Sequence, residues 1–127
     1  MSRAMSTIES HSFDSAQAKA YLSEFLEDPS LDFLEDTFEY DADDLGEATD
    51  ALMAAELVAA LIGAPSPALP ADVKAQLKGA PSKKLLNKAR NAVRSILDPK
   101  SPLHAHWQEA GIEPWLGSVK ALLNRIT

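Results

Sequence analysis

The chain has 127 residues, of which 46% are hydrophobic and 24% charged, values typical of a single globular domain. It contains no cysteine, which excludes disulfide bonds, thiolate metal sites and a thiol nucleophile. No stretch approaches the ~20 uninterrupted apolar residues of a membrane span, and residues 1–12 lack the apolar core of a signal peptide. We therefore expect a cytoplasmic protein with no membrane partner, organised as a polar segment (residues 1–12) followed by one domain (residues 13–127).

The charge is distributed unevenly along the chain. Residues 1–63 hold fifteen acidic and two basic side chains, a net charge of −13, whereas residues 64–127 hold four acidic and ten basic side chains, a net charge of +6. This asymmetry predicts that the acidic half either packs against the basic half or offers an acidic surface to a partner. Nucleic acid is not an expected partner, because its binding depends on clustered lysine and arginine.

Helix signals begin near residue 15. Asp14 or Ser15 can cap the N-terminus of a first helix, and Pro29 ends it. Ser30 can cap a short second helix that ends before the acidic turn at residues 41–44. Apolar residues recur at helical spacing in both segments, so each helix is expected to bury one face.

A third helix over about residues 45–62 is predicted to be the centre of the fold. Asp44 and Glu47 form the acidic variant of a capping box, and Gly63 stands where helices commonly end. From residue 51 onward this helix is apolar on every side except at Glu56, and a helix of that kind is normally buried. Its many alanines would let neighbouring helices approach closely.

The second half of the chain also reads as short helices. Residues 64–70 are rich in proline and predict an exposed connection. The segments expected after it are a fourth helix from Pro70 to Gly79, a fifth after Ser82, a sixth over about residues 102–110 and a seventh from Pro114. No segment alternates apolar and polar residues, so the sequence predicts an all-α, single compact domain of about six to seven short helices packed around the central Ala-rich helix.

Three stretches carry a resemblance to a known family. They are the Ala-rich helix with one acidic residue (51–63), the opening Phe13-Asp14-Ser15, and Ser101-Pro102-Leu103 followed by Trp107 and Trp115. With these stretches the chain resembles a family of small bacterial proteins catalogued as domain of unknown function 4259. The similarity extends from about Thr7 to Ile126. It departs from the family at Ser6-Thr7-Ile8-Glu9, where members usually have Gly-Ala-Trp-Gly. The resemblance implies the fold and no particular chemistry.

Glu56 is the most conspicuous single residue. A carboxylate on an otherwise apolar helix must be paired, hydrogen-bonded or protonated, because an isolated buried charge is very costly. We expect a structural ion pair with Arg90, which helical spacing places at the edge of the apolar stripe of the fifth helix. The alternative is a general acid or base.

A cluster of acidic residues is the candidate surface for a partner. Its members are Glu35, Asp36, Glu39, Asp41, Asp43 and Asp44. The run from Asp41 to Gly46 is similar to the start of an EF-hand loop, but Leu52 stands where a bidentate glutamate is needed, so no calcium site is expected. The cluster is interpreted either as a solvated face with helix-capping acids or as a docking surface for a basic protein.

The histidines and tryptophans are interpreted as structural. His104 and His106 are two residues apart, which puts them on different helix faces and does not suit a metal site. We expect His106 to be a core residue beside Trp107, and both Trp107 and Trp115 to pack in the core or at its edge. No metal and no cofactor are expected.

The sequence lacks the motifs that are typical of several classes of enzyme and nucleotide-binding protein. There is no phosphate-binding glycine loop, Gly-x-Ser-x-Gly elbow, His-Glu-x-x-His or dinucleotide fingerprint. The basic residues Lys83, Lys84, Lys88 and Arg94 have no interleaved aromatic residues on which bases could stack. The leading hypothesis is therefore a non-catalytic protein-interaction module, of inhibitor or immunity type, that docks a basic protein. The alternatives are a homo-oligomer pairing acidic and basic halves and, last, an enzyme using Glu56.

Overall fold

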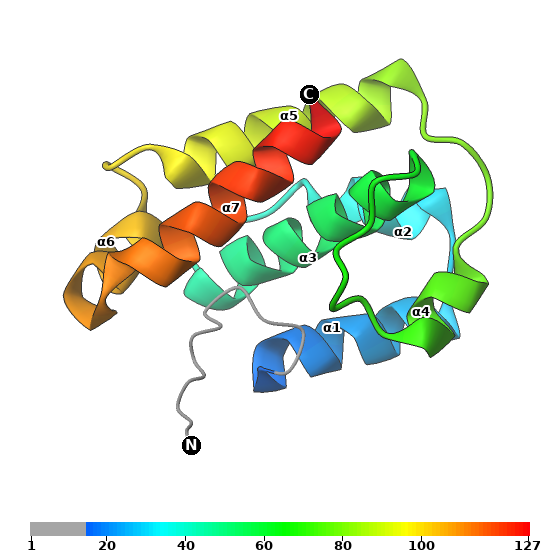
Figure 1. The fold of residues 1–127 in the computed structure, drawn as a ribbon, viewed down its shortest axis with the longest axis horizontal. Helices are drawn as coiled ribbons and strands as arrows, with labels where there is room; N and C mark the ends of the chain where they lie inside the picture. The colour runs from blue at the N-terminus through cyan, green and yellow to red at the C-terminus, as the bar shows by residue number, and fades with distance from the viewer. Residues whose placement is uncertain (1–14) are drawn as a thin grey trace.

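The computed structural model describes residues 15–127 and folds them into seven α-helices, with no strand in that range (Figure 1). The helices are α1 (Ala16–Glu27), α2 (Leu31–Thr37), α3 (Leu45–Leu61), α4 (Ala71–Gln76), α5 (Lys83–Leu97), α6 (Pro102–Ala110) and α7 (Ile112–Ile126). The predicted all-α class is confirmed. The predicted polar segment, residues 1–12, lies outside the described residues.

Four of the helices begin at a serine that accepts a hydrogen bond from a backbone N–H three residues further on. These serines are Ser15, Ser30, Ser82 and Ser101, at the starts of α1, α2, α5 and α6. Each hydroxyl satisfies one of the N–H groups that a first helical turn leaves without a partner. These four helix starts could be predicted because the contact is local in sequence.

The start of α3 is capped on one side only. Asp44 accepts from the N–H of Glu47 at 3.0 Å, as the predicted capping box requires. The Glu47 carboxylate instead accepts from the N–H of Asp41 at 3.0 Å, because the N–H of Asp44 is already bonded to the Asp41 carbonyl. Glu47 therefore ties the acidic turn, rather than the cap residue, to the helix.

Two helix boundaries differ from the prediction. Helix α4 ends at Gln76 instead of Gly79, because Leu77 adopts an extended backbone and packs half-buried against the core. Helix α7 begins at Ile112 instead of Pro114. Proline is tolerated in a first helical turn, where its missing N–H would have no partner within the helix.

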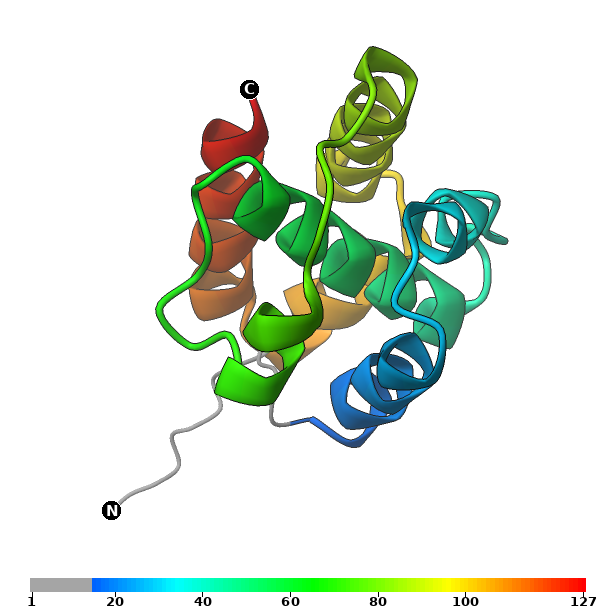
Figure 2. The ribbon, with the colours of Figure 1, turned by 90° about the vertical axis from the view of Figure 1, so that its right-hand side faces the viewer.

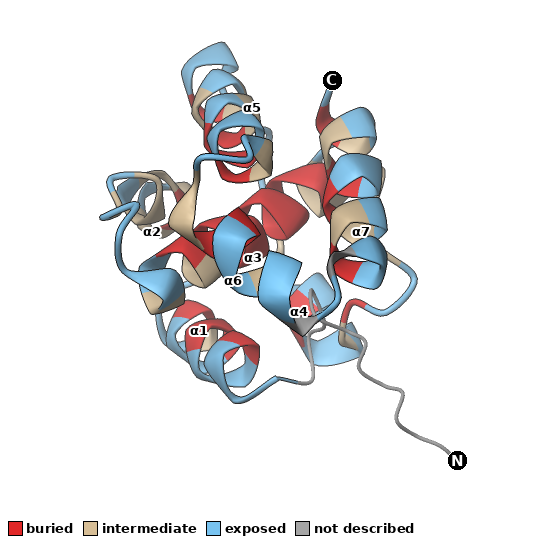
Figure 3. Ribbon diagram, turned by 90° about the vertical axis from the view of Figure 1, so that its left-hand side faces the viewer, coloured by how far each residue is buried: buried red, intermediate tan, exposed pale blue. Residues whose placement is uncertain are grey.

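Helix α3 lies at the centre, as predicted. It contacts α1, α2, α5, α6 and α7, which surround it in Figure 2. Every residue from Ala51 to Ala59 is buried, including Glu56, and Figure 3 shows this buried stretch between the outer helices. Small alanine side chains allow close packing on several sides at once.

The outer helices lie on two sides of α3. Helices α5 and α7 pack together and run in opposite directions along one side of α3 (Figure 1). Helix α1 lies on the other side of α3, and α4 packs against α1. Among the described helices, none combines the length and apolar character needed to cross a bilayer.

Candidate functional site

Glu56 forms a buried, two-pronged ion pair with Arg125. The Arg125 guanidinium donates to both carboxylate oxygens, at 2.8 and 3.0 Å, and also to the carbonyl of Ala64 at 3.2 Å. The Glu56 side chain is only 2% exposed, whereas that of Arg125 is 24% exposed. The paired geometry is that of a strong carboxylate–guanidinium contact, and it ties α3, the following loop and α7 together.

The predicted partner, Arg90, was wrong. The Nε of Arg90 donates to the carbonyl of Ile126 at 2.5 Å, and its Nη1 donates to Asn87 at 3.3 Å. The last carbonyls of a helix lack partners within the helix, so Arg90 is drawn to the end of α7. Arg125 reaches Glu56 because α7, in addition to α5, packs on α3.

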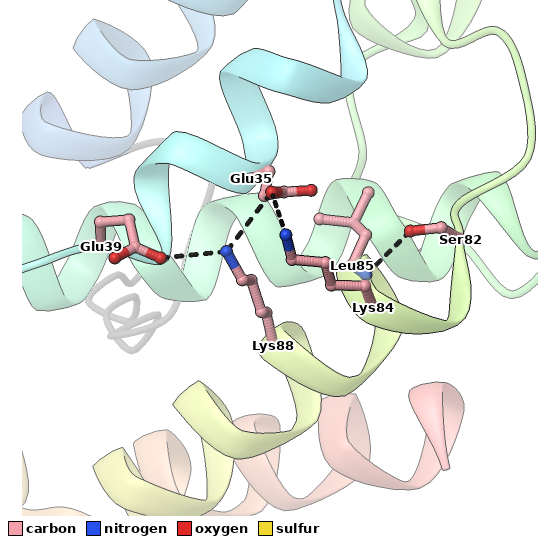
Figure 4. Close-up of polar contacts among 6 residues, drawn as sticks. All are labelled: Glu35, Glu39, Ser82, Lys84, Leu85 and Lys88. Atoms are coloured by element: carbon pink, nitrogen blue, oxygen red, sulfur yellow. Dashed lines mark hydrogen bonds and ion pairs between the residues drawn. The ribbon is translucent and has the colours of Figure 1, made fainter.

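Part of the acidic cluster is matched by lysines within the same chain. Glu35 lies 3.7 Å from the Lys84 ammonium and 3.4 Å from that of Lys88, and Glu39 lies 3.0 Å from Lys88 (Figure 4). These contacts join α2 and the residues just after it to α5, and thus the acidic half of the chain to the basic half. The pKa of Lys88 is raised, chiefly by its hydrogen bond to Glu39. Glu35 and Glu39 are therefore not simply solvated acids.

The other members of that cluster have separate surroundings. Asp44 caps α3, and the Asp41 carboxylate accepts from the N–H of Asp43 at 2.9 Å within the turn. Asp36 is exposed on α2 and faces a cleft. The six residues thus divide among an interhelical ion-pair network, a helix cap, a turn and a cleft.

The structure gathers a different set of acids around one concavity, the acidic cleft. This cavity of about 330 Å³ lies among α1, α2, the residues after α2 and the start of α3. Among the described residues, five carboxylates and no basic side chain line it: Glu24, Asp36, Glu39, Glu47 and Asp50. Sequence reasoning missed Glu24, Glu47 and Asp50. For Glu47 and Asp50 the sequence does show an i, i+3 spacing, which places both side chains on one face of α3. For Glu24 it shows no comparable pattern.

The walls of the acidic cleft are aromatic. Tyr21, Phe33 and Tyr40 line it, and the rings of Tyr21 and Phe33 lie 5.3 Å apart. The Thr37 hydroxyl donates to the carbonyl of Phe33 at 3.0 Å, so the Tyr21 hydroxyl donates in turn to Thr37 at 2.7 Å. Burial raises the pKa of Tyr21 well above its ordinary value, which keeps this phenol protonated.

Within the acidic cleft, Asp50 is a carboxylate whose pKa is raised. Partial burial raises its pKa, and the neighbouring carboxylates of Glu24 and Glu47 raise it further. The Gln17 side-chain amide, which donates to Asp50 at 2.8 Å, acts in the opposite direction. The burial and the neighbouring carboxylates disfavour the charged form of Asp50. A cation placed nearby would favour that charged form.

Replacing Asp50 with asparagine is expected to stabilise the protein slightly at neutral pH. Because the native pKa of Asp50 is raised, the native state binds its proton before the unfolded chain does as the pH falls. The charged form therefore lowers stability above the native pKa, and this loss disappears on acidification. Asparagine can still accept from Gln17. We expect a gain below about 1 kcal/mol, since the site is partly solvated, measured by urea unfolding at pH 7 and absent near pH 3.

The histidine assignment is corrected by the structure. His104 is the buried histidine, and its ring meets that of Trp115 edge-on at 5.9 Å, whereas His106 is exposed. Leu103 and Trp107, four residues apart, define the inward face of α6, and His104 adjoins that face. Both tryptophans pack in the core or at its edge, as predicted: Trp115 is fully buried, and the half-buried Trp107 stacks on it. Within residues 15–127 no group of three or more potential ligands is arranged to hold a metal.

Comparisons with known proteins give one match. Neither the curated proteins nor the solved structures include a significant match. A family described as "Domain of unknown function (DUF4259)" matches residues 6–118, which include α1 to α6 and the beginning of α7. Arg125 lies beyond that match. The chain belongs to this family of domains of unknown function.

Proposed function

We propose that this chain is a cytoplasmic, non-catalytic protein-interaction module that binds a basic side chain of a partner protein in the acidic cleft. The observation that carries the proposal is the cleft itself, a cavity of about 330 Å³ whose described lining has five carboxylates and no basic residue. Only Glu39 among these five has a lysine partner within residues 15–127. Carboxylates crowded in this way repel one another, and a cation relieves that repulsion.

Arginine and lysine suit both components of the lining. Their charged groups can pair with the carboxylates, while their apolar stems lie along aromatic rings. Phe33 and Tyr40, which are half-buried, also line the cleft with aromatic rings suited to a cation–π contact. Nucleic acid fits this cleft poorly, because its phosphates would meet carboxylates of the same charge.

The two alternative functions receive less support from the geometry. Glu56 is held by two hydrogen bonds from Arg125 and does not line the acidic cleft, so it lacks the access that a general acid or base needs. In a head-to-tail oligomer, the lysines of one copy would meet the acids of another. Lys84 and Lys88 already lie beside Glu35 and Glu39 of their own chain.

The proposal is tested by affinity capture from an extract of the source organism at low salt. The variant Glu24→Gln/Asp36→Asn removes two charges from the cleft. It leaves in place the contact of Glu47 with the acidic turn and the ion pair of Glu39 with Lys88. We expect the parent chain to retain a basic protein, this variant to lose it, and added salt to weaken the capture.

The matched control is Glu27→Gln/Asp32→Asn, which makes the same charge change at exposed positions of the same two helices, outside the cleft lining. It should retain the partner. Equal capture by the parent and both variants would show that the acidic cleft is not the binding site. Equal loss in both variants would indicate that overall charge, rather than the cleft, decides binding.

A further inference from the structure

Tyr40 is a wall common to three adjoining hollows on one side of the molecule. It lines the acidic cleft, an apolar pocket of about 280 Å³ and a groove of about 240 Å³ along α5. Its side chain is half-buried, and its hydroxyl makes no hydrogen bond with any of the residues that the structure describes. Ser95 of α5 lines both the apolar pocket and the groove. These hollows therefore meet around one half-buried phenol.

The apolar pocket differs in character from the acidic cleft. Its apolar walls come from the turn before α3, from α3, from the end of α5 and from the start of α6: Ala42, Ala48, Ile96, Pro102 and Leu103. The Ser101 hydroxyl in its lining is already used, because it donates to the carbonyl of Ile96 at 2.6 Å and accepts from the N–H of His104. Its charged lining residues, Asp98 and Lys100, are one of each sign. The pocket favours an apolar occupant, because most of its lining is apolar and its two charged residues are of opposite sign.

We propose that one extended segment of the partner fills these hollows, with a lysine or arginine side chain in the acidic cleft and a leucine-sized apolar side chain in the apolar pocket, on the two sides of Tyr40. This inference rests on the proposed function and specifies the chemistry of its partner. Charge complementarity assigns the basic side chain to the cleft, and the walls assign the apolar one to the pocket. The free Tyr40 hydroxyl is placed to bond to the backbone of the segment between them.

A single segment is favoured over a small organic cation. A cation alone would occupy the cleft and leave the neighbouring apolar walls exposed to water, whereas a segment covers both. Because the two side chains are joined, the second binds at a high effective concentration once the first is in place. The pair should therefore bind more tightly than either side chain alone.

The test titrates the full-length chain, labelled with ¹⁵N, with blocked seven-residue glycine–serine peptides. One series carries an arginine and a leucine separated by zero to three residues, and reference peptides carry only the arginine, only the leucine, or a glutamate with the leucine. We expect the best arginine–leucine peptide to bind at least about tenfold more tightly than either single-side-chain peptide. Its amide shift changes should include both Asp36 and Leu103, one from each hollow.

Variants in each hollow test the apolar pocket and the acidic cleft separately. Ser95→Trp places a bulky ring at an exposed position in the lining of the pocket and should reduce the affinity of the arginine–leucine peptide to that of the arginine-only peptide. Ser95→Ala, at the same position, should leave it unchanged. Glu24→Gln/Asp36→Asn should instead remove the advantage given by arginine, and circular dichroism verifies that each variant stays helical.

The outcomes distinguish this inference from the proposed function. Arginine peptides that bind equally well with and without leucine, and that are unaffected by Ser95→Trp, would overturn the two-part site and leave the acidic cleft as the binding site. If no arginine peptide binds although cleft-dependent capture of a basic protein succeeds, the inference of an extended segment is overturned, and the partner presents its basic side chain from a folded surface.

Discussion

Replacing Arg125 with leucine is expected to lower the free energy of unfolding by about 3 kcal/mol. The change leaves the carboxylate of Glu56, which is 2% exposed, without the guanidinium that donates to both of its oxygens. The value lies at the lower end for a broken buried pair, because Arg125 is 24% exposed and water can enter where it stood. Urea unfolding of the parent and the variant at neutral pH measures the difference.

Three control variants show whether the lost stability comes from the broken contact between Arg125 and the Glu56 carboxylate. Glu56→Gln should be milder, since an uncharged amide costs less to bury than a charge. Glu56→Leu/Arg125→Leu should recover much of the loss, because apolar replacements of a buried pair are often neutral. Arg90→Leu should cost only about 1–2 kcal/mol, the value of its bond to the carbonyl of Ile126. A loss in Arg90→Leu as large as that in Arg125→Leu would contradict the assignment of Arg125 as the partner that matters.

Replacing Trp115 with alanine is expected to cost about 3–5 kcal/mol. Trp115 is fully buried, stacks on Trp107 at 6.4 Å between ring centroids and meets the ring of His104 at 5.9 Å. The substitution leaves a cavity where α6, α7 and the core meet and removes two aromatic contacts. Thermal unfolding followed by circular dichroism should show a melting temperature well below that of the parent.

Trp115→Phe is the informative control for this position. The indole Nε1 of Trp115 is buried and has no hydrogen-bond partner among the described residues. Phenylalanine loses some buried area but also removes that unsatisfied donor, whose burial costs about 1–3 kcal/mol. We therefore expect Trp115→Phe to be much milder than Trp115→Ala. Equal losses in the two variants would show that the indole N–H itself is stabilising.

These two substitutions also separate folding from binding. Arg125 and Trp115 do not line the acidic cleft, whereas Glu24 and Asp36 line it and are exposed. Stability should therefore depend on the first pair and partner capture on the second. This separation makes the cleft variants usable, because exposed substitutions away from caps and buried pairs rarely change stability by more than about 0.5 kcal/mol.

The candidate site could be predicted only in part. The excess of acid in the first half of the chain directed attention to the region around α2, and Asp36 and Glu39 of the predicted cluster line the cleft. Glu35 does not line the cleft, and Lys84 and Lys88 contact it from α5, about fifty residues away in the sequence. Glu24 and Asp50 were missed because their place in the cleft depends on how α1 and α3 pack, and not on any local pattern.

Local signals in the sequence are enough to predict the helices and their order. Ser15, Ser30, Ser82 and Ser101 each bond to a backbone group three residues away, and the apolar run after residue 50 requires burial wherever it is placed. The packing of the helices sets which arginine meets Glu56, which histidine is buried and which acids share a cleft. A helix's pattern shows which face turns inward, but the neighbour that this face meets depends on how the helices cross in space.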